Sequence, residues 1–316
     1  MTISNPLPQQ RSSPAKAKGF TLVELLVSIS LLVLIIVILG TITGHISKIW
    51  TEVNAQNQRR ANARALLQFI AKDLQSVRLP VTPATSGITG HGVITPSSTT
   101  GYLQLAISGA TAGIPSGCLN PHALFWQAPV GDSGKMVVVG YYVRWDTTAT
   151  VKKSCLCRYS ASVSSTIYSG NNQNNWASNA YPTQSPMAFP YPNLLAENVI
   201  ALFVRCVNEA GTPITQDATG TLQASSGYAF DSLKGYKDPA TSIAYPAPAL
   251  PPAIEISIVV VDAKTAQKIT TQLTPTPTTP SALNQDIQSF VNGLPAYIKT
   301  GAEIYSTTVF LPHPAN

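Results

Sequence analysis

The sequence predicts an α+β protein in which one long N-terminal helix, first transmembrane and then amphipathic, packs on an antiparallel β-sheet head with long loop insertions. Two observations carry this prediction: an apolar run that passes into helical periodicity before Pro80, and a series of Val-, Ile-, Tyr- and Phe-rich segments after it. We divide the chain into a leader (residues 1–19), a helix (20–79) and a head (80–316). With 316 residues, of which 44% are hydrophobic, the chain can bury a sizeable core.

The segment from Phe20 to Leu39 reads FTLVELLVSISLLVLIIVIL, and twenty helical residues measure about 30 Å, the thickness of a bilayer's hydrocarbon core. Sixteen of these residues are Phe, Leu, Ile or Val, which outweigh the insertion cost of Glu24, at most about 3 kcal/mol. Arg11, Lys16 and Lys18 precede the span, so the N-terminus is expected in the cytoplasm and the head outside it. An ordinary secretory signal peptide has a shorter apolar region and a small-residue cleavage site, and neither feature fits.

Glu24 lies one turn into the span and has two interpretations. The carboxylate is either tolerated there, because it is close to the interface and to the positive end of the helix dipole, or it has a partner within the membrane. Hydrocarbon penalises an ionised group without a partner, so a functional role is the default hypothesis for such a residue.

Apolar residues continue at spacings of three and four after the span: Ala63, Leu67, Ile70, Leu74 and Val77. This period is typical of an amphipathic helix, so one helix is expected from about Phe20 to Arg78. Pro80 ends it, because the residue before a proline is pushed towards an extended conformation.

Five later segments are rich in strand-forming residues and are expected to form one antiparallel sheet: 103–108, 137–145, 154–160, 199–207 and 254–261. In the last of these, alternation predicts that the isoleucines are buried and that Glu255 and Ser257 face solvent. Four long irregular stretches are interpreted as loop insertions: 80–101, 161–193, 211–250 and 271–285.

Cys118, Cys155, Cys157 and Cys206 all lie in the head, where disulfides persist if it is outside the cytoplasm. We favour disulfides or buried thiols over a zinc site, because the single C-x-C does not match zinc-ligand spacing. Four cysteines allow three pairings, and Cys155 and Cys157 are expected to bond elsewhere rather than to each other. No metal site and no cofactor are predicted.

The net charge of +6 includes three basic residues of the leader, which leaves +3 on the remainder. So small a charge does not supply the clustered Lys/Arg stripe that phosphate neutralisation requires, and the sequence does not support nucleic-acid binding.

The run KGFTLVE, residues 18–24, stands immediately before the apolar segment and resembles the type IV prepilin processing motif. The resemblance implies that a prepilin peptidase cuts between Gly19 and Phe20 on the cytoplasmic side and that Phe20 becomes N-methylated. It also implies that the Glu24 carboxylate pairs with the Phe20 amine of a neighbouring subunit during assembly. Glycine suits the cleavage site, because a side chain there would obstruct an extended backbone in a protease groove.

The order of the later segments resembles the J-type minor pseudopilins of type II secretion systems: RRANARALLQFIAKDLQSVRLP, GYYVRWD, SCLCRYS, LLAENVIALFVRCVNEAG and LPPAIEISIVVVDA. It is also similar to the pilin-like proteins of Verru_Chthon cassettes. The chain departs from the J-type pattern in its Asn/Ser/Pro-rich loop insertions and in its extended tail after Ala263.

The resemblance implies a structural subunit, a minor pilin or pseudopilin of a type IV pilus-like or type II secretion filament, and not an enzyme. It implies a single-pass protein of the inner membrane with its head in the periplasm. Its expected partners are prepilin peptidase, other pilin-like subunits and the assembly platform in the inner membrane. Two alternatives stay open: a membrane-anchored periplasmic binding or enzymatic domain exported by a pilin-type signal, and a DNA-uptake minor pilin with a basic patch on its head.

Overall fold

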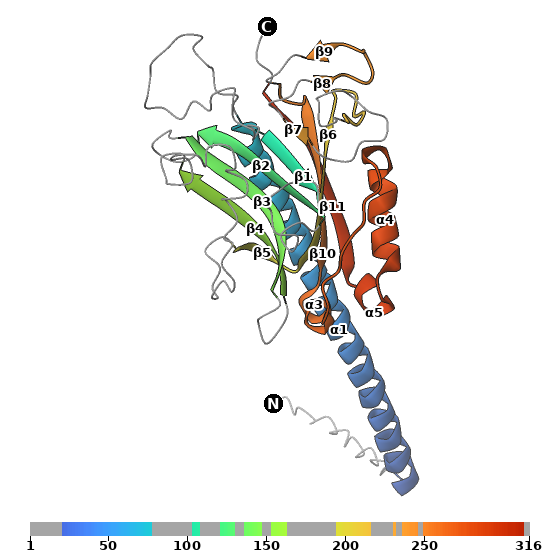
Figure 1. Cartoon of the computed structure of the whole chain (residues 1–316). Helices are drawn as coiled ribbons and strands as arrows, with labels where there is room; N and C mark the ends of the chain where they lie inside the picture. Colours follow the sequence, from blue (N-terminus) through green and yellow to red (C-terminus); the bar gives the residue numbers. More distant parts are fainter. Residues whose placement is uncertain are drawn as a thin grey trace, which may run out of the picture. The chain divides into compact units, whose positions relative to one another are not determined.

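The long helix α1 (Leu22–Gln75) runs through both of the compact units into which the chain divides, residues 1–58 and 59–316 (Figure 1). The computed structural model describes residues 21–77, 103–107, 121–129, 136–146, 153–162, 194–215, 230–231, 236–245 and 249–312. The division falls inside the helix, so the last turns of α1 belong to the head unit.

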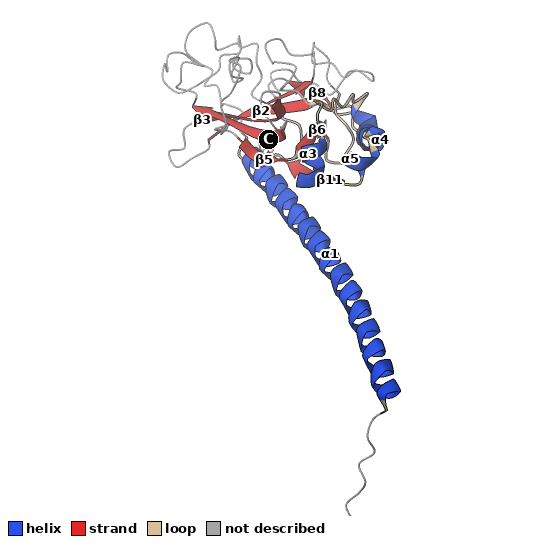
Figure 2. Cartoon of the chain, turned by 90° about the horizontal axis from the view of Figure 1, so that it is seen from below, coloured by secondary structure: helices blue, strands red, loops and turns tan. Residues whose placement is uncertain are grey.

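The single long helix predicted from the sequence is confirmed, and α1 is drawn as one continuous element in Figure 2. All five residues of the predicted apolar stripe, from Ala63 to Val77, are buried, and Leu66 is buried beside them. Spacings of three and four place these side chains on one face of the helix, and that face lies in the core of the head unit.

The described part of the head contains three antiparallel sheets, not the single sheet expected. The largest has six strands in the order β5 (Leu194–Glu197), β4 (Lys153–Ser162), β3 (Met136–Asp146), β2 (His122–Pro129), β1 (Leu103–Ile107) and β7 (Phe230–Asp231). The second has the order β11 (Ala302–Phe310), β10 (Ala253–Val261) and β6 (Val199–Val207). The third is the pair β8 (Tyr236–Lys237) and β9 (Ala244–Tyr245). All five predicted strands exist, but three belong to the first sheet and two to the second.

Asn198 is the physical reason for this partition. It stands between β5 and β6 with a φ of 65°, a left-handed conformation that asparagine tolerates better than most residues. Its N–H donates to the carbonyl of Ser154 on β4 at 2.9 Å, and its carbonyl accepts from the N–H of Val261 on β10 at 2.9 Å. The chain therefore leaves one sheet and enters the other at this residue, which is bonded to both.

The C-terminal part of the chain contains helices that the sequence prediction missed. They are α3 (Ala263–Lys268), the 3₁₀ turn η3 (Pro280–Ala282), α4 (Leu283–Gly293) and α5 (Ala296–Lys299). Phe290 of α4 packs edge-on against Phe203 of β6, with ring centroids 6.2 Å apart, so α4 covers a face of the three-stranded sheet.

The prediction that Glu255 and Ser257 face solvent is wrong, because α4 packs on Phe203, the cross-strand partner of Ser257. Ile254, Ile256 and Ile258 are buried as predicted, but Ser257 is buried too and shares a 2.7 Å hydrogen bond with the Ser306 hydroxyl of β11. Glu255 lies 2.7 Å from the Arg205 guanidinium. Burial of both faces of β10 is possible because each of these polar side chains has a partner.

Two of the predicted insertions, 80–101 and most of 161–193, lie outside the described residues. The other two are partly ordered into elements, since 211–250 contains β7, β8 and β9, and 271–285 contains η3 and the start of α4.

Candidate assembly helix and its anchorage

The N-terminal part of α1 is apolar, and its described side chains are exposed. Every residue from 21 to 55 is exposed, and the large hydrophobic side chains run from Leu22 to Val53. By length and composition the helix can cross a membrane. Apolar side chains in this number require a lipid or protein environment, because leaving each of them in water costs about 1.5–3 kcal/mol.

Thr21 caps this helix immediately before its first turn. Its hydroxyl accepts a hydrogen bond from the N–H of Glu24 at 3.3 Å, and its carbonyl accepts from the N–H of Leu25 at 3.2 Å. The sequence T-x-x-E is typical of a capping box, so the N-terminal end of α1 is specified locally. Thr21 was not among the residues predicted to have a role, although the T-x-x-E motif at residues 21–24 indicates a cap.

Glu24 is therefore the third residue of the helix, on its exposed surface and near the positive end of the helix dipole. Gly19 and Phe20, the residues predicted for cleavage and methylation, lie outside the described residues. The pairing of Glu24 with a Phe20 amine stays a prediction.

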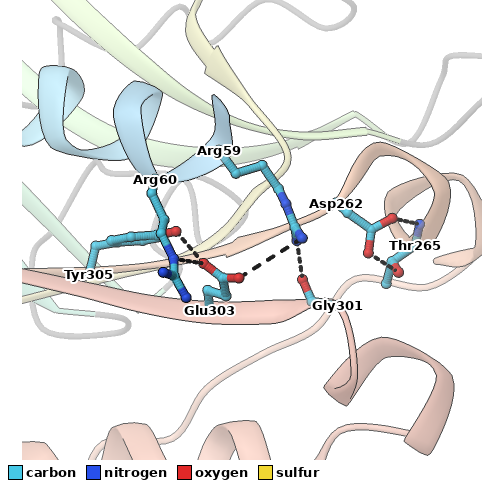
Figure 3. A network of polar contacts seen from close by, with 7 residues as sticks. All are labelled: Arg59, Arg60, Asp262, Thr265, Gly301, Glu303 and Tyr305. Carbon is cyan, nitrogen blue, oxygen red and sulfur yellow. Dashed lines mark hydrogen bonds and ion pairs between the residues drawn. The ribbon is translucent and has the colours of Figure 1, made fainter. Parts of the chain in front are cut away.

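A network of polar contacts joins α1 to the C-terminal strand within the head unit (Figure 3). Arg59 donates to the carbonyl of Gly301 at 3.2 Å and lies 3.9 Å from Glu303. Arg60 lies 3.8 Å from the same carboxylate, which also accepts a hydrogen bond from the hydroxyl of Tyr305. Burial and this carboxylate raise the pKa of Tyr305 to about 12, so the phenol stays a donor.

Asp262 extends the network to the start of α3. Its carboxylate accepts from the N–H and the hydroxyl of Thr265, at 2.8 and 2.6 Å, and so caps α3. Burial would raise the pKa of Asp262, but these hydrogen bonds and the charge of Arg59 outweigh it and lower the pKa. Gly301 lies against this cap: a Cβ at that position would collide with both side chains.

A second contact between charged groups fixes the last turns of α1 on the six-stranded sheet. Asp73 accepts hydrogen bonds from the Tyr141 hydroxyl of β3 and from Nε of Arg158 on β4, both at 2.7 Å. The Arg158 guanidinium also lies over the Phe69 ring, 5.6 Å from its centroid. Burial would lower the pKa of Arg158, but Asp73 outweighs it and raises the pKa. The same burial and carboxylate raise the pKa of Tyr141, which stays protonated.

His122 connects the two larger sheets. Its Nδ1 accepts a 2.8 Å hydrogen bond from the N–H of Val204 on β6, and the neighbouring Pro121 forms a parallel bridge with Leu202. The imidazole is fully buried, with its ring edge-on to Phe203 at 6.1 Å. Burial lowers the pKa of His122 to about 3, so the ring is neutral at physiological pH.

Three of the four cysteines are described, and all three are buried thiols: Cys155, Cys157 and Cys206. Cys118 lies outside the described residues, so the disulfide prediction is not tested for it. The Sγ atoms of Cys155 and Cys157 lie 3.8 Å apart on β4. Each is therefore near the other, although the sequence predicted that they bond elsewhere. Within the described part of the chain, no group of three or more His, Cys, Asp and Glu side chains is arranged to hold a metal ion.

Comparison with known proteins places a functional motif at the N-terminus. Residues 14–40 match the family model described as the prokaryotic N-terminal methylation motif. The match contains Gly19, Phe20 and Glu24 and the apolar part of α1 up to Gly40. No curated protein and no solved structure matches the chain.

Proposed function

We propose that this chain, a type IV pilin-like protein by its methylation motif and its long apolar helix, is a minor pilin or pseudopilin subunit of a filament. In this proposal prepilin peptidase removes residues 1–19 and Phe20 is N-methylated. The mature helix then leaves the inner membrane to pack among the helices of other pilin-like subunits, with the head in the periplasm. The chain's role is structural assembly, not catalysis.

The observation that carries this proposal is the length of the uncovered apolar surface. A membrane anchor needs about 20 residues, which Phe20–Leu39 supplies. Beyond Leu39 the helix still exposes Ile42, Ile46, Ile49 and Val53, each with between 46% and 59% of its surface accessible. Val53 is 14 residues past the span, about 21 Å along a helix and beyond the interfacial layer of a bilayer. A protein that is only anchored has no use for this surface, whereas a filament subunit buries it.

These four residues, which we term the distal stripe, share the spacing of the stripe that packs in the head. The positions 42, 46, 49 and 53 differ by four, three and four, as do 63, 67, 70 and 74. Gln56 and Arg60 occupy the positions between the two stripes and are polar. The same spacing is therefore buried in the head at residues 63–74 and exposed at residues 42–53. Helices with apolar residues at this spacing pack side by side.

Glu24 supplies the second element of the proposal. Its backbone N–H donates to the Thr21 cap, which places Glu24 in the first turn of the helix. The new amine of Phe20 on a neighbouring subunit is the partner that would offset its desolvation, and such a pair fixes the axial position of one helix against the next.

The test compares three variants of the full chain in the cell that makes it: Ile46→Gln with Ile49→Gln, Glu24→Gln, and Thr51→Gln as the matched control. Thr51 is exposed and lies on the side of the helix opposite the distal stripe. All should be inserted and cleaved, which the mass of the mature N-terminus reports. The isoleucine variant should co-purify at least about tenfold less with other pilin-like subunits, since each buried isoleucine contributes about 1.5–3 kcal/mol. Glu24→Gln should also co-purify less, because its neutral amide cannot form an ion pair with the Phe20 amine. The control should match the wild type.

An intact Met1, or cleavage beyond Gly40, would overturn maturation by a prepilin peptidase. Correct maturation together with unimpaired recovery of the Ile46/Ile49 variant would instead favour the anchored binding or enzymatic domain.

A further inference from the structure

We propose that Cys155 and Cys157 are an oxidisable dithiol pair, a modification site that forms a disulfide within a single strand. The two Sγ atoms are 3.8 Å apart, and both side chains are buried on the same face of β4. A disulfide requires an Sγ–Sγ distance of about 2.05 Å, so the two atoms must approach by less than 2 Å, about the scale of a rotamer adjustment.

The outer strand β5 is irregular beside this pair, whereas β3 on the other side pairs with β4 without a register shift. In the ladder between β4 and β5, Cys155 pairs with Glu197 and Leu156 pairs with Ala196, but Cys157 pairs with Leu194. Leu195 of β5 is the extra residue, so the register shifts between Leu156 and Cys157. The bulge therefore lies in β5 and not in β4, and it disrupts the ladder that covers this edge of β4.

Cys206 provides the contrast within the same molecule. It lies in the main hydrophobic core on β6, and burial raises the pKa of its thiol, which keeps it protonated and unreactive. Cys155 and Cys157 lie outside that core cluster, near the end of the six-stranded sheet where β5 has only four residues. A short outer strand opens more readily than a central one, and such local opening gives a disulfide reagent access to the pair.

The reaction is thiol–disulfide exchange. The thiolate of one cysteine attacks an external disulfide, and a mixed disulfide forms as the first thiol of the reagent leaves. The second cysteine of the pair then attacks the mixed disulfide, which releases the other thiol. Two S–H bonds are lost and one S–S bond forms in β4; the two electrons reduce the external disulfide, and the two protons end on its thiols.

A ring closed between residues two apart constrains the unfolded chain little, so this disulfide adds little stability, and mild reductants should reopen it. The pair therefore fits a reversible modification at the β4–β5 edge better than a permanent staple.

The sequence around the pair allows a direct test. Trypsin cuts after Lys153 and Arg158 and releases Ser154–Arg158, a peptide that contains both cysteines and no other. The full chain in detergent is reduced, equilibrated with oxidised glutathione, unfolded in acid and then in denaturant, alkylated and digested. Most of this peptide should be two hydrogens lighter and carry no alkyl group, while Cys206 should be alkylated; dithiothreitol before alkylation should restore two alkyl groups.

The same experiment on a Cys118→Ser variant separates this pair from a link to the fourth cysteine, and the two-hydrogen loss should be unchanged there. The proposal is wrong if the peptide carries two alkyl groups or glutathione adducts, or if it is joined to the peptide that contains Cys118. Each of these outcomes is read by mass and does not depend on export or filament assembly.

Discussion

Lowering the pH from about 8 to about 5 is expected to destabilise the head through one buried side chain, His122. The imidazole accepts the N–H of Val204 at Nδ1, so only the ring with an unprotonated Nδ1 makes this bond. Burial lowers the pKa of His122 from 6.5 to about 3. Between these two values the unfolded chain binds a proton and the folded chain does not, so stability falls as the pH falls.

The size of the effect follows from the two pKa values. At pH 5 the unfolded imidazole is almost fully protonated and the folded one is neutral, which corresponds to about 2 kcal/mol of lost stability relative to pH 8. The loss grows by about 1.4 kcal/mol for each further pH unit and stops growing near pH 3. Working above pH 5 keeps most carboxylates ionised and isolates the contribution of the histidine.

Urea unfolding of the full chain in a non-ionic detergent can measure this loss, because Trp126 and Trp145 are buried in the head and report its unfolding. The matched variant is His122→Asn, whose amide oxygen can accept the Val204 N–H but does not titrate. It should be less stable than the wild type at pH 8, because it removes ring atoms from the core, but it should lack the 2 kcal/mol dependence on pH. Equal losses in the two proteins between pH 8 and 5, to within about 0.5 kcal/mol, would refute the assignment.

Two further predictions concern the contacts that hold α1 in the head. Gly301→Ala should destabilise the head by about 1–3 kcal/mol in urea unfolding, because the new methyl group collides with the cap of α3; Gly293→Ala, with open space at its Cβ, is the control and should be neutral or slightly stabilising. Arg158→Ala should cost about 3 kcal/mol by leaving Asp73 partly buried without its ion pair, and the double variant with Asp73→Ala should show a coupling of at least about 1 kcal/mol. Strictly additive losses would mean that the ion pair contributes nothing.

The elements predicted correctly are those whose signal is contiguous in the sequence. The apolar spacing between Ala63 and Val77 and the β-branched run of β6 each suffice to define a helix face or a buried strand. β11 was missed because Glu, Ser and Thr occupy four of its nine positions and hide a strand that β10 pairs along its whole length. The helix α4 was missed because the Pro- and Thr-rich segment before it appeared to continue as a loop.

The contacts that position α1 could not have been predicted in the same way. Arg59 and Glu303 are 244 residues apart, and Asp73 and Arg158 are 85 apart, so no local spacing pairs them. The division into two sheets depends on one backbone conformation, the positive φ of Asn198. The N-terminal motif, in contrast, could be predicted, because Thr21, Glu24 and the apolar segment are adjacent in the sequence.

The two charged contacts also suggest how a pull on the helix would reach the head. Arg59 and Arg60 bind β11 of the three-stranded sheet, and Asp73 binds β3 and β4 of the six-stranded sheet, about 20 Å further along the helix. Five buried apolar side chains of α1 lie in the core that both sheets share: Ala63, Leu66, Leu67 and Ile70 between these contacts, and Leu74 just after Asp73. An axial displacement of α1 would have to break an ion pair on each sheet and drag five buried apolar side chains past their neighbours. Because these interactions act together, residues 59–75 of α1 and both sheets should move as one body.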